Sequence, residues 1–586
     1  MQDASRGRPP GAAAPQGDPS AGAPQGDPSA GAPQGDPSAG APRTALQASD
    51  PTATPAIWGE AFPVAVWRTV LGERPVAVSC EGEGALLHGA REGRAVRLGT
   101  LPVGGRILTP AERALEWLWV EGAHGPVTWS IAEQVALPPV TVVVPTFRRE
   151  RDALAQVRRF LAMETVTRVV VVDQGGTLEA MPAFRTLQEA HEELHLVSQP
   201  NLGGSGGYAR GMVEAASDPG AAILLSDDDA VLSAESLRRM VTYQALAARP
   251  TILGTPLFSA HRPSRLLTHT EAVRPGFFQW ATADGLRRAA DLAGTTPEQW
   301  TFLALHEQAN YTGWWGTLLP PGTPQALGLP VPLFLKWDDA EYGLRATAHG
   351  LDHAVLPGTA VHHPPWTAYR TQMSWTARVL HRNRLAVAAA YGAGRGVIGS
   401  SLIHQLKHIL AGHLLTAELW ESGIDAVSAG PEAWMGQDLR TVRAESTEVL
   451  QRWHGEHDAV APPEATHQAP LPLPRALARA ASRMLLPDRT PRVVLEVPAT
   501  RVHWRTTLGG DVLRITDAAG AVESAMTVRG SAMRHALGRT LRSHAQLARS
   551  WDALRERYRA ALPQHTTAAS WTALFEAASD DTTERI

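Results

Sequence analysis

The sequence is poor in cysteine and in net charge. Cys80 is the single cysteine among 586 residues, so the chain cannot form an internal disulfide. The formal net charge is only -4, and acidic and basic residues are interspersed without the basic stripe that a nucleic-acid backbone requires. These two deficits argue against a disulfide-stabilised secreted domain and against nucleic acid as a partner.

The sequence also lacks a long apolar run. Its most apolar stretch, residues 397–416, is interrupted by Lys407 and three histidines, which makes it unsuited to cross a bilayer. The first residues, Met1 to Arg6, lead into proline and glycine rather than into the apolar segment of a secretion signal. We therefore expect a cytoplasmic protein with peripheral membrane contact at most.

The chain divides by composition into four parts. Residues 16–42 repeat one nonapeptide three times without a large apolar side chain to bury, which predicts a disordered head over residues 1–55 rather than a solenoid. Residues 56–138 carry short strand-like runs between Gly-rich turns, typical of a β-sandwich that binds sugars or serves as a packing module. Residues 396–586 are mainly helical, with a β-like interruption near residues 493–515.

Residues 139–395 alternate buried strands with helices. This alternation predicts an α/β domain built on a doubly wound, mostly parallel sheet. Ligands of such sheets bind outside the carboxyl ends of the strands. The strands of this part are expected to end at Val144, Val172, Val197 and Leu225.

Three consecutive carboxylates, Asp227 to Asp229, follow the last of these strands. Three like charges repel one another unless a cation is present, and oxygens two residues apart can share one Mg2+ or Mn2+ whose remaining positions suit a diphosphate. A solvated acidic turn or a helix N-cap would give the same pattern. His362 and His363 follow a later apolar strand, and one of them can supply a third ligand. The sequence does not choose between the two histidines.

Polar residues also follow the earlier strands. Arg149 can pair with a donor phosphate or pack in the first loop, and Gln174 can bond a uracil or sugar edge. The Gly-rich segment 199–210 contains a dinucleotide-type match, but it follows the third strand and precedes an acidic triplet. Close approach of the backbone to a nucleotide-sugar explains these glycines equally well.

A second acidic motif, Asp338-Asp339, lies farther along the chain. An inverting sugar transfer needs one carboxylate that accepts the proton of the acceptor hydroxyl, and either aspartate can do this. A pair of acids at a helix N-terminus is the plain alternative. Upstream, Trp314 and Trp315 can stack on sugar rings or fill the core.

Taken together, these motifs resemble one family, the GT-A galactofuranosyltransferases that extend bacterial cell-wall galactan. The resemblance covers most of the chain from Trp58 onward. It is carried by these segments: Pro145-Thr146-Phe147-x-Arg149, Asp173-Gln174-Gly175, residues 199–207, Asp227-Asp228-Asp229, Gly313-Trp314-Trp315, Lys336-Trp337-Asp338-Asp339-Ala340 and residues 363–366.

The resemblance implies a role for particular residues. Arg149, Gln174, Asn201 and Asp227 would contact UDP-galactofuranose, and Asp339 would be the general base. A divalent cation, Mn2+ or Mg2+, would be held by Asp227, Asp229 and His363. The acceptor side would be lined by Glu271, Trp280, Trp314, Trp315, Asp338 and Trp366. The resemblance further implies an N-terminal β-sandwich, a helical C-terminal region, a homotetramer at the inner membrane face and polyprenyl-linked galactan acceptors.

Three departures from the family pattern concern the acceptor rather than the donor. The repeat-rich head is additional, Pro364-Pro365 stiffens the histidine loop, and His381 lies one place too close to Arg382-Asn383 to take over a family role. A GT-A transferase with a UDP-hexopyranose donor, acting on another surface polysaccharide, is the alternative enzyme. A nucleotidyltransferase is disfavoured because its first strand should feed a Gly-rich loop. A non-catalytic carbohydrate-binding protein is the alternative outside enzymes.

Overall fold

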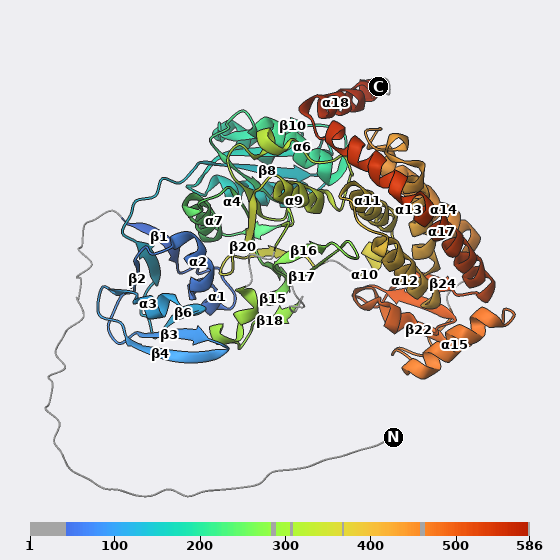
Figure 1. Ribbon diagram of the computed structural model, residues 1–586, viewed down its shortest axis with the longest axis horizontal. Helices are drawn as coiled ribbons and strands as arrows, with labels where there is room; N and C mark the ends of the chain where they lie inside the picture. The colour runs from blue at the N-terminus through green and yellow to red at the C-terminus, as the bar shows by residue number, and fades with distance from the viewer. Residues whose placement is uncertain (1–42, 283–288, 305–308, 366–367, 458–462, 584–586) are drawn as a thin grey trace, which may run out of the picture.

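A computed structural model describes residues 43–282, 289–304, 309–365, 368–457 and 463–583. Figure 1 shows an N-terminal part in blue, a central α/β part in teal and green and a helical C-terminal part that runs from yellow to red. Within the residues that the structure describes, no helix is both long and apolar enough to cross a membrane.

The N-terminal part consists of two antiparallel sheets. One has the order β1-β7-β2-β5 and the other the order β4-β3-β6. Phe62 stacks on Trp67 and Trp129 in the buried core. The elements are β1 (Thr44–Ala48), α1 (Ala56–Glu60), α2 (Val64–Leu71), β2 (Val76–Ser79), β3 (Leu86–Arg91), β4 (Arg94–Thr100), β5 (Arg106–Ile107), α3 (Pro110–Arg113), β6 (Trp117–Glu121) and β7 (Thr128–Ile131).

The predicted boundary of the head at residue 55 is wrong. β1 pairs with β7, and Leu46 and Gln47 are fully buried. The segment Thr44–Ala48 contains one large apolar residue, which is too weak a pattern to reveal a strand. Gln47 is tolerated inside because its amide donates to the Ala61 carbonyl at 2.9 Å. The nonapeptide repeats lie outside the described residues.

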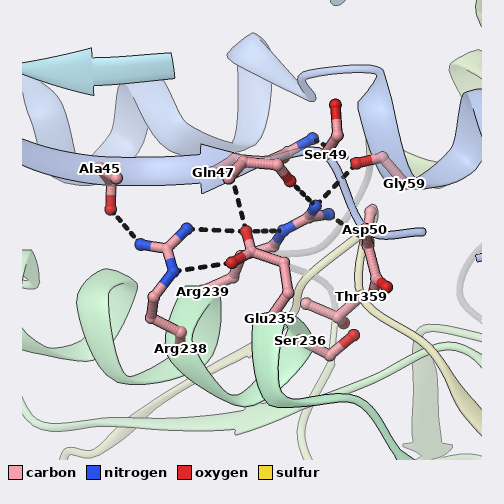
Figure 2. Close-up of polar contacts among 12 residues, drawn as sticks. Ala45, Gln47, Ser49, Asp50, Gly59, Glu235, Ser236, Arg238, Arg239 and Thr359 are labelled. Carbon is pink, nitrogen blue, oxygen red and sulfur yellow. Dashed lines mark hydrogen bonds and ion pairs between the residues drawn. The ribbon is translucent and has the colours of Figure 1, made fainter. Parts of the chain in front are cut away.

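Buried polar contacts fasten β1 to the central part through α7 (Ala234–Leu246) (Figure 2). The Ala48 N–H donates to Glu235 Oε1 at 2.7 Å, and Arg238 donates to the Ala45 carbonyl. Just beyond β1, Asp50 accepts a hydrogen bond from Ser233, the N-cap of α7, at 2.5 Å. The first strand is therefore part of the folded unit.

Deleting residues 1–55 should lower the melting temperature by several degrees, whereas deleting residues 1–42 should leave it unchanged. The longer deletion removes the buried Leu46 and leaves Glu235 without the Ala48 N–H, and each loss costs about 1 to 3 kcal/mol. Thermal unfolding of both truncated proteins beside the full chain measures the difference. Equal melting temperatures for the two deletions would show that β1 contributes nothing.

The central sheet has the order β10-β9-β8-β11-β19-β13-β20. The first four strands are mutually parallel, β19 is antiparallel to both of its neighbours, and β13 and β20 are parallel. The bounds are β8 (Val140–Thr146), β9 (Val166–Asp173), β10 (Leu194–Ser198), β11 (Ala222–Leu225), β13 (Thr251–Gly254), β19 (Thr317–Leu319) and β20 (Asp352–Val355). The α/β fold and the four predicted strands are confirmed. The strand order reverses between β8 and β11, where such sheets bind ligands.

Helices cover this sheet: α4 (Glu150–Leu161), α5 (Pro182–Ala190), α6 (Gly203–Ala215), α7, α8 (Thr323–Leu327) and α9 (Asp338–Ala348). The glycines of α6 allow it to pack closely on β8. A Cβ on Gly207 would lie 2.6 Å from the Pro145 Cβ, and one on Gly211 would lie 2.0 Å from Val143 Cγ1. Close packing of α6 on β8 therefore accounts for both glycines, of which Gly207 belongs to the Gly-rich segment 199–210.

A smaller sheet with the order β12-β21-β14-β15-β18 lies beside the central sheet. Its strands are β12 (Val231–Leu232), β14 (Leu257–Ser259), β15 (Arg262–Thr268), β18 (Ala290–Asp291) and β21 (Val361–His363), and a separate hairpin is formed by β16 (Glu271–Arg274) and β17 (Gln279–Thr282). β21 carries both members of the histidine pair. Strand alternation therefore turns His362 and His363 toward opposite faces.

The chain from residue 368 onward is mainly helical with one three-stranded sheet, and it includes the part 396–586 that was predicted to be mainly helical. Its elements are α10 (Ala368–Gln372), α11 (Thr376–Ala390), α12 (Gly396–Leu410), α13 (Leu414–Ala429), α14 (Thr441–His457), α15 (Leu473–Leu485), β22 (Val494–Pro498), α16 (Trp504–Thr507), β23 (Val512–Thr516), β24 (Val522–Thr527), α17 (Gly530–Ala561) and α18 (Ala568–Thr583). Most of α11 is buried against α13 and α17. His381 stacks on Trp420 with ring centroids 3.9 Å apart, so this histidine belongs to the helical core.

Candidate active site

The acidic triplet lies directly after β11, at the edge where the strand order reverses. Its three carboxylates have different partners. Asp227 Oδ1 accepts a hydrogen bond from the Tyr208 hydroxyl at 2.7 Å. Asp228 is turned away and accepts one from Thr146, at the end of β8, also at 2.7 Å. The outer two aspartates are therefore the ones available to a common ligand.

His363 completes a three-ligand cluster with these outer aspartates. Its Nε2 lies 3.1 Å from Asp229 Oδ1 and 4.0 Å from Asp227 Oδ2. Ligand atoms of the three residues lie within 4.8 Å of one another. Nδ1 donates to the Pro364 carbonyl at 2.6 Å, which directs Nε2 toward the carboxylates. Two carboxylates and one imidazole suit Mn2+ or Mg2+, so these residues fit the predicted cation.

The structure settles which histidine belongs to the cluster. His362 faces the other side of β21, where it contacts the ring of Phe258 at a centroid distance of 5.7 Å. Burial lowers the pKa of His362, which keeps its imidazole neutral. Burial also opposes the charged form of His363, but the hydrogen bond to Asp229 and the charges of both aspartates raise the pKa of His363 above its usual value.

Arg149, at the start of α4, contacts Asp228 and Asp229 of the triplet. Its guanidinium donates to Asp229 Oδ2 at 2.6 Å and lies 3.5 Å from Asp228 Oδ1. Burial raises the pKa of Asp228 to about 7. Burial acts the same way on Asp229, but His363 and Arg149 hold its pKa below the usual value. The side chain of Arg149 is 43% exposed, so its guanidinium can also bind an anionic ligand at the sheet edge.

The loop residues predicted to contact the donor brace the entrance to α6. Gln174 Oε1 accepts from the Leu202 N–H at 2.9 Å, and its Nε2 donates to the Gly203 carbonyl at 3.1 Å. Asn201 Oδ1 accepts from the Gly203 N–H at 3.0 Å. Asp173, fully buried at the end of β9, accepts four backbone N–H groups of residues 175–178. This capping role of Asp173 was not predicted.

Asp338 and Asp339 form the first turn of α9, after a loop with an unusual backbone. Phe334, Lys336 and Trp337 have φ values of 71°, 69° and 71°, which residues with a Cβ rarely adopt. Burial raises the pKa of both aspartates, and the charge of Asp338 raises the pKa of Asp339 further. The charge of Asp227 adds to the raised pKa of Asp338, so the two acidic motifs lie near each other.

Asn383 of α11 holds this loop, and sequence reasoning did not assign it a role. Its side-chain amide is fully buried and lies within hydrogen-bond reach of the carbonyls of Leu333, Leu335 and Lys336, at 3.1, 2.9 and 2.9 Å. Arg382 donates to the backbone carbonyl of Leu333 at 3.1 Å and to the side-chain oxygen Oδ1 of Asn383 at 3.0 Å. A polar pair within an alanine-rich helical stretch was the available signal.

The residues predicted for the acceptor side divide by exposure. Glu271 accepts from Thr268 at 2.6 Å and from Tyr311 at 2.7 Å, and its charge helps to raise the pKa of Asp339. Trp280 is 38% exposed, and Trp315 is partly exposed.

Trp314 and Trp366 are the remaining aromatic residues predicted for the acceptor side. Trp314 is only 6% exposed and packs edge-on against Tyr208 and Tyr342, so it forms the wall behind the site rather than a stacking surface. Trp366 lies outside the described residues.

The chain is similar to known proteins. Residues 138–388 match the family model described as glycosyltransferase like family 2. The chain is 29% identical over 570 residues to galactofuranosyltransferase GlfT2 of Mycolicibacterium smegmatis, covering 88% of each protein. It is 30% identical over 480 residues to galactofuranosyltransferase GlfT2 of Mycobacterium tuberculosis, covering 75% of this chain and 74% of that protein. Among solved structures, GalNAc-T7 with UDP, GalNAc and Mn2+ overlaps 45% of this chain and 52% of its own, at 10% identity and a TM-score of 0.33.

Proposed function

Because the chain belongs to the galactofuranosyltransferase family and is a glycosyltransferase, we propose that it transfers galactofuranose from UDP-galactofuranose to a growing galactan in cell-wall synthesis. One observation carries this proposal. The cluster of Asp227, Asp229 and His363 lies at the carboxyl edge of the sheet, and the charge of Asp227 reaches Asp338 in the acidic turn Asp338-Asp339. A donor diphosphate and an acceptor hydroxyl can thus be handled from two sides.

On the donor side, Asp227, Asp229 and His363 would hold a divalent cation, Mn2+ or Mg2+. When bound, the cation supplies positive charge that neutralises the departing diphosphate. Arg149 adds a second positive charge beside it, because its guanidinium is half exposed and already directed at Asp229. Gln174 and Asn201 shape the loop before α6 and would meet the uridine from there.

On the acceptor side, Asp339 is the proposed general base. The acceptor oxygen attacks the anomeric carbon of galactofuranose, the bond from that carbon to the diphosphate oxygen breaks, and UDP leaves with the bonding electrons. The proton of the acceptor hydroxyl passes to the Asp339 carboxylate. Attack opposite the leaving group inverts the anomeric configuration. Glu271, Trp280, Trp315 and Asp338 would line the path of the acceptor, and Trp314 would support it from behind.

One surface supports contact with a lipid-linked acceptor at the membrane. Helix α15 packs on the protein through the buried Ala476 and Ala480 and leaves Leu473, Leu477 and Leu485 exposed by 40%, 46% and 81%. An adjoining cavity of about 650 Å³ is lined by two acids and six arginines: Asp488, Asp511, Arg475, Arg479, Arg483, Arg489, Arg492 and Arg529. Exposed leucines beside arginines suit the interface of an anionic membrane. The family resemblance adds the proposal that the protein works as a homotetramer.

Replacing Leu477 and Leu485 by aspartate should weaken binding to phosphatidylglycerol vesicles by about tenfold or more. Each leucine would otherwise contribute up to about 1.5 to 3 kcal/mol of binding free energy by burying its side chain in the membrane. Sedimentation with vesicles measures it. Val103→Asp is the matched control, because Val103 is 67% exposed and belongs to the N-terminal part. Equal binding of the double variant and the control would remove α15 from the membrane contact.

The experiment that tests the proposed reaction compares donors. The protein is incubated with UDP-galactofuranose or UDP-galactopyranose and a short lipid-linked galactofuranose acceptor, and products are identified by mass. We expect acceptor extension with the furanose donor alone. Extension with the pyranose donor would establish the alternative transferase, and sugar binding without release of UDP would establish a non-catalytic protein.

A further inference from the structure

The cation ligand His363 is reached through a short segment, Gly358–Ala360. β20 ends at Val355 and β21 begins at Val361, so this segment determines where the histidine strand starts. Gly358 adopts a φ of +87°, a left-handed conformation that favours glycine. His363 lies only three residues beyond the segment.

Two side chains from elsewhere in the chain hold the last two residues of this segment. The indole N–H of Trp58, in the N-terminal part, donates to the Thr359 carbonyl at 3.1 Å. The Ala360 N–H donates to the hydroxyl of Ser236, on α7, at 3.2 Å. The position of β21 is therefore fixed from outside its own sheet.

Arg239 holds the first residue of the segment and joins it to the N-terminal part (Figure 2). It is fully buried, and its Nε donates to Glu235 Oε1 at 2.8 Å. The guanidinium also donates to three backbone carbonyls from three segments, those of Ala48, Gly59 and Gly358. Ala48 and Gly59 belong to the N-terminal part. The buried guanidinium of Arg239 thus connects the N-terminal part to the segment before His363.

The N-terminal part also contacts the loop that carries the two aspartates of the cation cluster. α7 begins just after the triplet, and its N-cap Ser233 lies four residues beyond Asp229. Ser233 donates to Asp50, which again belongs to the N-terminal part, at 2.5 Å. The two chain segments that supply cation ligands are therefore both held by the N-terminal part.

We propose that the N-terminal part, acting through Trp58 and Arg239, positions His363 against Asp227 and Asp229 and so sets the affinity of the cation site. Cation ligands must lie within a few tenths of an ångström of their required positions, so a small shift of β21 would loosen the site. Trp58 and Arg239 touch no reacting atom and are positioning residues. The inference rests on the proposed cation-dependent transfer.

A pair of tryptophan variants tests this role in the full chain. Trp58→Phe keeps a ring in its aromatic cluster but removes the N–H that holds Thr359. Trp117→Phe is the matched control, because Trp117 is fully buried in the same cluster and its indole N–H has no hydrogen-bond partner among the described residues. Both rings lie 5.3 Å from Trp300, so the packing losses should be similar.

Mn2+ binding, read from the electron paramagnetic resonance signal of free Mn2+ at saturating UDP, is the measurement. Trp58→Phe should weaken Mn2+ binding by roughly three- to tenfold, near the lower end of the loss caused by residues that support metal ligands, and Trp117→Phe should match the wild-type protein. Arg239→Lys should weaken it at least as much, since an ammonium group cannot reach the three carbonyls in the same geometry.

Three results would overturn the inference. Unchanged Mn2+ affinity in both Trp58→Phe and Arg239→Lys would do so directly. Equal weakening in Trp58→Phe and Trp117→Phe would assign the effect to general packing. If the wild-type protein binds no Mn2+, the proposed cation site itself is refuted and this inference falls with it, whereas the first two results leave the proposed function intact.

Discussion

Replacement of Asp339 by asparagine is expected to reduce transfer by about a hundredfold or more, in line with the loss of a general base. Asparagine keeps the shape of the side chain but cannot accept the proton of the acceptor hydroxyl. UDP affinity should remain nearly unchanged, because the residues proposed to bind UDP, Arg149 and the cation cluster, are located at the first acidic motif and not at Asp339. Initial rates and UDP titration on the same variant separate the two effects.

Asp338→Asn is the matched control for this variant, since Asp338 is the adjacent residue in the same helical turn and is 7% exposed. A larger loss in Asp338→Asn than in Asp339→Asn would move the base to Asp338. A loss of UDP affinity in Asp339→Asn would instead make Asp339 part of the donor site.

The pH dependence of transfer follows from the same carboxyl group. Burial, with the negative charges of Asp338 and Glu271, raises the pKa of Asp339 above the usual aspartate value. The base must be ionised, so the rate should rise with pH through this raised pKa and fall as pH drops below it. We therefore expect the acid limb of kcat/KM well above pH 4, and we expect Asp339→Asn to remove it. An acid limb retained in that variant would assign it to another group.

Replacement of Asp229 by alanine is expected to reduce transfer by roughly a thousandfold, because charge neutralisation by a bound cation is worth several kcal/mol. Asp229 is the carboxylate nearest to His363 Nε2, at 3.1 Å, and it is also the main partner of Arg149. Its removal should abolish tight Mn2+ binding, which calorimetric titration with Mn2+ measures.

Asp228→Asn provides the comparison within the same triplet. Its carboxylate bonds Thr146 and points away from the cation cluster, so Mn2+ affinity should change little. If Asp229→Ala transfers galactofuranose at the wild-type rate after all divalent cations have been chelated, the cation has no part in the reaction.

Local patterns predicted the central sheet well because its strands are buried on both faces. The runs ending near Val144, Val172 and Leu225 consist almost wholly of apolar residues, and such runs stand out without any long-range information. The first strand, Thr44–Ala48, escaped prediction because its burial depends on partners far along the chain, in β7 and α7.

Within the site, the sequence revealed charged residues better than the residues that hold them. The triplet and Asp338-Asp339 are conspicuous as acids after apolar runs. The choice of His363 over His362 required the strand orientation, which the sequence leaves open by one residue. The sequence also could not separate the roles of Trp314 and Trp315. The two are adjacent and alike, but Trp314 is buried and Trp315 is partly exposed.

The hydrogen bonds from Asn383 to the loop before Asp338 determine when, during ribosomal synthesis, the chain can become active. α11 is itself buried by α17, where Leu547 and Trp551 lie in one core with Leu385, and Trp551 donates to the Ala393 carbonyl at 2.8 Å. These residues leave the ribosome more than two hundred positions after Asp339. At synthesis rates of about 5 to 20 residues per second, the delay is roughly ten to forty seconds. We expect the nascent chain to complete its donor edge first and to become able to deprotonate an acceptor only when almost fully made.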